Sequence, residues 1–219
     1  MYYNDSLHNH VKRLVSDLNP ELGKTLKYKS ATIGGSNLSH HNLDSHLEPG
    51  KLGIQEPFEL VILQGGSSDA LSSERRALFQ AKAVEFDQKI RAKGGETALY
   101  MIHAYVKPHK RYDPEMIRKV EKLYVETAKD INALLIPVGL AFERAYAERP
   151  DIQLHKIFDG THPSLLGTYL AACVVYASVY QQSPVGSDYD YFGKINKKDA
   201  AFLQNIAIQT VRELKQRTL

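Results

Sequence analysis

Leu60-Val61-Ile62-Leu63-Gln64-Gly65-Gly66 is the stretch that decides the fold of this 219-residue chain. Four apolar residues in a row, followed by two glycines, predict a short parallel strand that is buried on both faces. A long helical pattern follows, which begins at Ser72 or Ser73 and ends at Gly94-Gly95. A buried strand followed by an amphipathic helix is the repeating unit of a parallel α/β sheet.

The same alternation continues along the rest of the chain. The expected strands are 27–33, 97–106 and 135–138, and the expected helices are 6–17, 113–134, 142–146 and 197–216, with a further buried helix after Pro163. Repeated strand–helix units predict an α/β fold, a three-layer α/β/α sandwich around a parallel sheet. The length suits one core, so we expect residues 1–219 to form a single domain.

The composition excludes several classes of protein. A formal net charge of +3 is too small and too evenly spread to indicate nucleic-acid binding. No apolar run is long enough to span a bilayer, and the first residues do not resemble a signal peptide. We therefore expect a cytoplasmic protein, or a secreted or periplasmic one if an N-terminal segment is missing. Cys173 is the only cysteine and is expected to pack in a helix core.

The strongest chemical signal is Phe158-Asp159-Gly160-Thr161-His162-Pro163-Ser164. Asp-Gly favours a turn, and Pro163 is expected at the first position of the helix that follows. A histidine held by a nearby carboxylate has the fixed tautomer and the stabilised imidazolium that a general base needs. The alternative from the residues alone is an ordinary turn and helix cap.

Three loops in this order resemble those of the SGNH (GDSL-like) hydrolase superfamily, which comprises flavodoxin-like α/β esterases, lipases and carbohydrate deacetylases. They are Ala31–Asn37, Val61–Asp69 and Asp159–Pro163, and Ser183-Pro184-Val185-Gly186 is similar to the C-terminal part of bacterial members. The resemblance implies that Asp159 orients His162 as the base. It also implies that Gly35 and a donor from residues 66–68, best matched by Ser67, form the oxyanion hole. Neither a metal ion nor an organic cofactor is implied.

The nucleophilic serine of that superfamily is the part that is hard to place. There it follows the first strand, whereas this chain begins with what resembles the next segment, Tyr2–Leu7. The first strand and the serine are therefore expected upstream of Met1. Asn4-Asp5-Ser6-Leu7 mimics Gly-Asp-Ser-Leu, which makes Ser6 a weaker candidate nucleophile, although helix capping also explains it. Ser36 and Ser67 are further alternatives.

The resemblance implies a serine esterase or deacetylase that acts on an O-acyl ester, most simply an acetylated carbohydrate. The alternative is a truncated or degenerate, catalytically silent protein of the same fold with a binding or structural role. The expected partner is a small-molecule or carbohydrate ester, with no nucleic acid and no membrane. A missing strand would leave an unpaired sheet edge, so we also expect lower stability or a homodimer that covers the gap.

Other polar clusters have simpler interpretations. His40, His41 and His46 lie near Asp44 and Glu48, but no spacing matches a zinc site, so a solvated loop or short helix is favoured. The histidine of the 97–106 strand, His103, is expected in the core or in a cleft. The basic run 107–111 is interpreted as a solvated loop, and the aromatic run 189–192 as either a sugar-binding wall or a packed loop.

Overall fold

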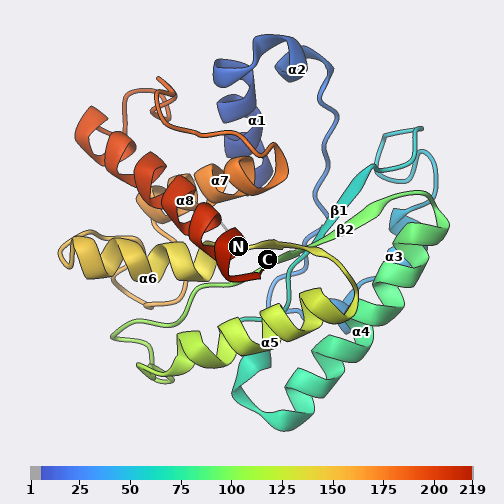
Figure 1. Ribbon diagram of the computed structural model, residues 1–219. Coiled ribbons are helices and arrows are strands. Elements are labelled where there is room, and N and C mark those ends of the chain that lie inside the picture. Colours follow the sequence, from blue (N-terminus) through green and yellow to red (C-terminus); the bar gives the residue numbers. More distant parts are fainter. Residues whose placement is uncertain (1–5, 219) are drawn as a thin grey trace. The chain divides into compact units, whose positions relative to one another are not determined.

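The computed structural model describes residues 6–218 (Figure 1). These residues form two compact units. Within the described residues, unit 1 comprises 6–28, 103–114 and 136–218, and unit 2 comprises 29–102 and 115–135. The single domain expected over residues 1–219 therefore stays a prediction.

Unit 2 is built around a small sheet. Strands β1 (Leu60–Leu63), β2 (Glu96–Tyr100) and β3 (Leu134–Ile136, whose last residue returns the chain to unit 1) lie in the order β1-β2-β3. β1 and β2 pair in parallel, with Leu60 opposite Glu96. Helices α4 (Ser73–Ala92) and α5 (Met116–Asp130) pack on β2 and on each other. The mixed α/β fold class with a parallel sheet is confirmed.

Three strand predictions need correction. β1 is not buried on both faces, because it lies at the edge of the described sheet; Ile62 is 41% exposed and only Leu63 is buried. β2 ends at Tyr100 rather than at residue 106. Residues 27–33 form no regular strand and are mostly exposed, since no neighbouring strand pairs with them there. The chain passes from unit 1 to unit 2 within this segment.

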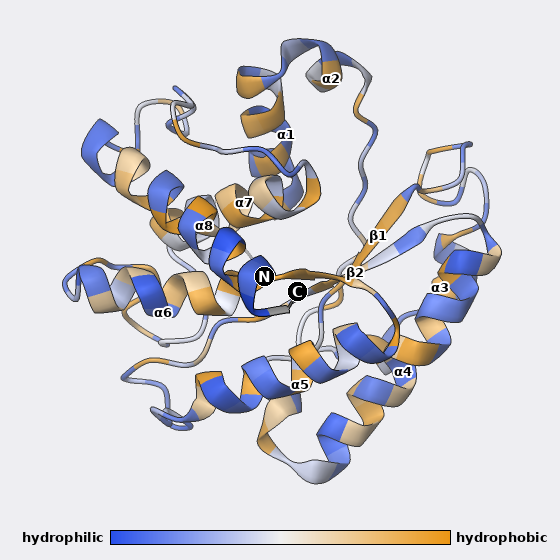
Figure 2. Ribbon diagram, in the orientation of Figure 1, coloured by the Kyte–Doolittle hydropathy of each residue, from blue (hydrophilic) through white to orange (hydrophobic). Residues whose placement is uncertain are grey.

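The limits of α4 follow from its sequence. Ser72 is the N-cap, and its hydroxyl oxygen accepts the N–H of Arg75 at 3.3 Å. Gly94, just after the helix, has a φ of +83°, which a residue with a Cβ adopts with difficulty. Figure 2 shows both hydrophilic and hydrophobic residues along α4 and α5; α5 gathers its apolar residues on one face, whereas α4 does so only weakly. The packed residues of α4 are Phe79, Ala83, Phe86, Asp87 and Ile90.

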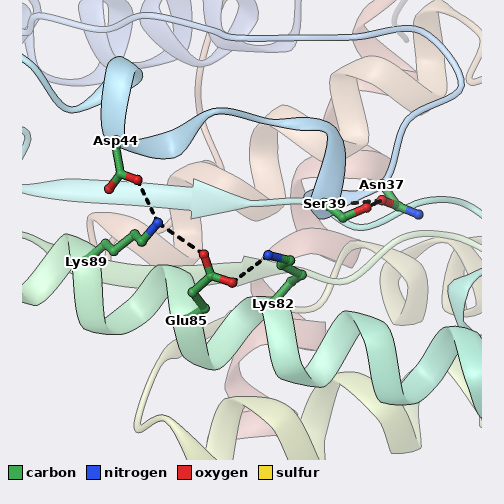
Figure 3. A network of polar contacts seen from close by, with 6 residues as sticks. All are labelled: Asn37, Ser39, Asp44, Lys82, Glu85 and Lys89. Carbon is green, nitrogen blue, oxygen red and sulfur yellow. Dashed lines mark hydrogen bonds and ion pairs between the residues drawn. The ribbon is translucent and has the colours of Figure 1, made fainter.

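A surface ion-pair network joins α4 to the short helix α3 (Leu43–His46), as Figure 3 shows. Lys89 Nζ lies 2.7 Å from Asp44 Oδ2 and 3.1 Å from Glu85 Oε1, and Glu85 Oε2 lies 2.5 Å from Lys82 Nζ. In the turn that precedes α3, the Asn37 side-chain oxygen accepts a hydrogen bond from the Ser39 hydroxyl. Exposed ion pairs contribute little to stability, so this network adds only a small stabilisation to unit 2.

Unit 1 is helical, and α7 (Leu165–Val179) is its central helix. It packs against α1 (Leu7–Leu18), α6 (Val138–Glu148) and α8 (Lys197–Thr218), while α2 (Pro20–Thr25) packs on α1. Every residue of α7 from Gly167 to Ser178 is buried, including the reduced Cys173, as the sequence predicted for this cysteine. Within residues 6–218, no helix is both long enough and apolar enough to cross a membrane.

Candidate active site

The turn at residues 159–162, in unit 1, brings the predicted acid and imidazole into direct contact. Asp159 Oδ2 lies 2.8 Å from His162 Nδ1. Asp159 Oδ1 accepts two backbone N–H groups, from Thr161 at 2.8 Å and from His162 at 2.9 Å. The carboxylate is thus held on one oxygen by the backbone and presents the other to the ring. About one-third of the His162 side chain is exposed (34%), so part of this residue faces solvent.

The electrostatics of this turn favour an ionised Asp159. Partial burial acts to raise the pKa of Asp159, but the N–H groups of His162 and Thr161 and the imidazole of His162 outweigh it. The pKa of Asp159 therefore lies below its ordinary value. A carboxylate that stays charged can orient an imidazole and stabilise its protonated form.

Gly160 allows the turn to pack tightly. Its φ is +63°, a left-handed conformation that favours glycine. A Cβ at this position would overlap the carbonyl oxygen of Val106 and lie 3.1 Å from His109 N. This close approach lets the N–H of Val106 donate to the carbonyl of Gly160 at 2.9 Å. The turn is thereby fixed to the segment that follows β2.

Helix α7 begins at Leu165, two residues later than predicted. Pro163 is not the first helical residue; it forms an antiparallel bridge with His155, and Ser164 is the N-cap. The Ser164 hydroxyl oxygen accepts the N–H of Gly167 at 3.1 Å. Ser has a side-chain acceptor that proline lacks, which explains why the cap falls on Ser164. A Cβ at Gly167 would overlap the Leu154 carbonyl, so the start of α7 sits directly against the backbone.

Two histidines lie behind the turn. His103 Nε2 lies 2.8 Å from the carbonyl oxygen of Thr161. His155 Nε2 donates to the carbonyl of Ala104 at 3.1 Å, and the hydroxyl of Tyr146 donates to His155 Nδ1 at 2.7 Å. Burial lowers the pKa of His103 to about 4 and that of His155 to about 3, so both rings are neutral at pH 7.

The sequence predicts His103 in the core or a cleft and indicates no role for His155 or Tyr146. His155 and Tyr146 lie nine residues apart, and His103 contacts Thr161 across 58 residues of sequence. The only local signal for this contact is that the polar ring of His103 lies inside an apolar strand pattern.

Two exposed apolar side chains, Ile157 and Phe158, precede the turn, and each is 72% exposed.

The two glycine loops of unit 2 lie next to each other. Gly35 has a φ of +69°, with open space where a Cβ would stand. A Cβ on Gly66 would lie 3.2 Å from the carbonyl oxygen of Ser36, which places residues 34–36 beside residues 65–66. The Ser36 hydroxyl donates to the carbonyl of Ile33 at 2.8 Å and lies 3.3 Å from His41 Nε2.

The second glycine loop differs from expectation at Gly66. Its N–H donates to Asp69 Oδ2 at 2.7 Å, so within residues 66–68 this backbone donor is already used. Ser68 is buried, and its hydroxyl accepts a hydrogen bond from Arg75 Nη1. Burial raises the pKa of Asp69, although Gly66 and Arg75 act against this. Ser67 is exposed.

The predicted site residues are divided between the two units. Asp159 and His162 lie in unit 1 with Ser6, whereas Gly35 and Ser67 lie in unit 2. Ser6 is the N-cap residue of α1 and has an extended backbone. Tyr2–Asp5, which carry the resemblance upstream of Ser6, lie outside the described residues. The joint oxyanion site and the role of Ser6 therefore stay predictions.

The described residues contain no metal-binding cluster. Among residues 6–218, no group of three or more His, Cys, Asp or Glu side chains could hold a metal ion. His40 accepts the N–H of Asn37 at 3.1 Å, and the rings of His41 and His46 lie 6.0 Å apart. His40 lies in the short 3-10 turn 38–40, His41 follows it, and His46 lies in α3.

Comparison with known proteins identifies the fold. No family model matches the chain, and no curated protein matches it either. A DUF4886 family protein from Bacteroides uniformis superposes with a TM-score of 0.71 at 14% identity, over 96% of this chain and 89% of that one. The acetyl xylan esterase AlAXEase superposes with a TM-score of 0.61 at 17% identity, over 80% of this chain and 96% of that one.

A proposed SGNH hydrolase from Slackia heliotrinireducens superposes with a TM-score of 0.55 at 22% identity, over 67% of this chain and 80% of that one. Together these likenesses show that the chain has the α/β fold of SGNH hydrolases and acetyl xylan esterases. This confirms the fold that the three loops implied.

Proposed function

We propose that this protein is a serine esterase of the SGNH type that removes acyl groups from an O-acylated carbohydrate, most simply an acetyl group. The observation that carries the proposal is the 2.8 Å contact between Asp159 Oδ2 and His162 Nδ1 on a partly exposed turn. The fold shared with acetyl xylan esterases supports the substrate class. Fold alone hosts many chemistries, so the turn is the stronger support.

In this mechanism His162 takes the proton of a serine hydroxyl on Nε2 while the serine oxygen attacks the ester carbonyl. The resulting imidazolium is stabilised by Asp159 and then protonates the leaving alcohol of the carbohydrate. His162 next takes a proton from water, which attacks the acyl-serine and releases acetate. The proton returns to the serine oxygen, so the enzyme ends as it began.

The oxyanion of each tetrahedral intermediate needs donors, for which we propose the Gly35 N–H and the Ser67 hydroxyl. The open space around Gly35 and the exposure of Ser67 are compatible with this role. A serine hydroxyl is shorter and less fixed than the asparagine amide of the superfamily. Since one missing oxyanion donor raises a barrier by about 3–4 kcal/mol, Ser67→Asn should increase the turnover number.

The first experiment assays acetate release from p-nitrophenyl acetate and from acetylated xylo-oligosaccharides. His162→Ala should abolish release, and Asp159→Asn should reduce it by about 10⁴-fold, as for other serine–histidine–aspartate enzymes. His8→Ala, on α1, is the control and should leave the rate unchanged. Full activity in His162→Ala would refute the assigned base.

The nucleophile is located by labelling with a fluorophosphonate probe, which reacts with activated serines, followed by mass spectrometry. The sequence interpretation predicts a label on a serine encoded upstream of Met1, with Ser6 as the second candidate. The assay is therefore run on the chain with and without any in-frame upstream codons. If neither form is labelled and neither releases acetate, the catalytically silent alternative holds.

A further inference from the structure

Two neighbouring peptide groups hold the carboxylate of Asp159. The N–H groups of Thr161 and His162 both donate to Asp159 Oδ1. In a trans peptide, the N–H and the C=O of the same group point in opposite directions. The carbonyls of Gly160 and Thr161, which belong to these two peptide groups, therefore face away from the carboxylate. What those carbonyls contact decides how firmly the carboxylate is placed.

Both carbonyls accept hydrogen bonds from residues 103–106. The Gly160 carbonyl accepts the N–H of Val106 at 2.9 Å, and the Thr161 carbonyl accepts from His103 Nε2 at 2.8 Å. The first bond is made by the main chain and does not depend on the side chain at position 106. The second bond depends on the imidazole of His103.

The surroundings of His103 make it a permanent donor on Nε2. A carbonyl oxygen can only accept, so the contact assigns the ring proton to Nε2. The ring stacks on Phe142 with centroids 4.6 Å apart and an interplanar angle of 10°, and it meets the edge of His155 at 4.8 Å. Its Nδ1 is buried and has no hydrogen-bond partner among the described residues, so no acceptor there competes for the ring proton.

We propose that His103 is a positioning residue for the Asp159–His162 pair. Its Nε2–H holds the Thr161 carbonyl, the N–H of the same peptide group holds Asp159 Oδ1, and Asp159 Oδ2 holds the ring of His162. Successive hydrogen bonds polarise one another, so loss of the first weakens the next. The catalytic consequence rests on the proposed esterase function, whereas the effect on Asp159 does not.

A purely structural role for His103 makes a different prediction. If the ring only fills space beside Phe142, phenylalanine at position 103 would serve equally well. If the donor matters, phenylalanine keeps the stacking but removes the hydrogen bond to Thr161. Glutamine lacks the ring but places an amide N–H at a reach similar to that of Nε2. The pair His103→Phe and His103→Gln therefore separates packing from hydrogen bonding.

The test is a carbon-13 NMR titration of the Asp159 carboxyl group in the full chain. In His103→Phe the pKa of Asp159 should rise toward its ordinary value, because the N–H donors that lower it are less firmly placed. In His103→Gln it should stay closer to that of the unchanged protein. An Asp159 that titrates identically in His103→Phe and in the unchanged protein would overturn the proposal.

Activity gives a second, separable measurement. For p-nitrophenyl acetate, kcat in His103→Phe should fall on the order of tenfold with little change in KM, because misplacing a reacting group slows the chemical step. His103→Gln should recover part of the loss. If the unchanged protein releases no acetate, the esterase proposal fails, but the titration of Asp159 still decides the role of His103.

The unchanged protein also allows a test that needs no variant. Nitrogen-15 NMR of the histidine rings at pH 7 should show His103 neutral, with its proton on Nε2. A proton on Nδ1 would exclude the hydrogen bond to Thr161 and overturn the proposal, even if His103→Phe fails to fold.

Discussion

Replacing Gly160 by alanine tests how tightly the 159–162 turn is packed. The left-handed φ of +63° is about 1 kcal/mol less favourable for alanine than for glycine. The new Cβ also overlaps the Val106 carbonyl, so the turn must move away from Val106. That movement weakens the 2.9 Å hydrogen bond from Val106 N–H to Gly160, which contributes about 1 kcal/mol. Gly160→Ala should therefore lower the free energy of unfolding by about 2 kcal/mol.

The matched control is Gly193→Ala, also in unit 1. Gly193 has a similar φ of +75° but has open space where the Cβ would stand, so only the backbone strain of about 1 kcal/mol applies. Urea unfolding followed by circular dichroism compares the two variants, which is convenient because the chain has no tryptophan. Equal unfolding free energies for the two variants would refute the close approach described at Gly160.

Three further predictions concern charge and burial. Because the pKa of Asp159 is lowered in the folded protein, its carboxylate stabilises the fold above the ordinary pKa of 3.8, and this stabilisation is lost as the pH falls through the lower folded pKa. Asp159→Asn should therefore flatten this part of the acid-unfolding curve, measured by circular dichroism. Burial raises the pKa of Glu143 above 4.5, so ionisation of its carboxyl group destabilises the fold as the pH rises through this raised pKa. Glu143→Gln should therefore unfold at a higher urea concentration than the unchanged protein at pH 8, but not below pH 4. Cys173 is fully buried and burial raises its pKa, so a thiol reagent should modify it only in denaturant, a reaction followed by absorbance.

Local features of the fold could be predicted from the sequence. Ser72 and Gly94 marked the ends of α4 because a cap and a left-handed residue act within a few positions of the chain. The contact between Asp159 and His162 was predictable for the same reason, since three residues on a turn bring their side chains together. Strand 27–33 was wrongly predicted, because strand formation depends on a neighbouring strand that local residues do not reveal.

Contacts between distant residues were beyond local reasoning. Nothing near His103 indicates that its ring reaches Thr161. Gly66 did offer a local signal, because an acidic residue three positions later can reach back to the N–H, as Asp69 does. The oxyanion donors are correspondingly the least predictable part of the site.

The segment between the His162 imidazole and the packed start of α7 in unit 1 is short and cannot change length easily. His162 is followed within five residues by Gly167, whose Cα lies against the Leu154 backbone, so an inserted or deleted residue there would displace either the helix or the ring. Ile157 and Phe158, by contrast, extend from the surface just ahead of the turn and can be exchanged without repacking. Substitutions that alter which substrate the protein binds should therefore accumulate before Asp159. Insertions and deletions should be rare between His162 and Gly167.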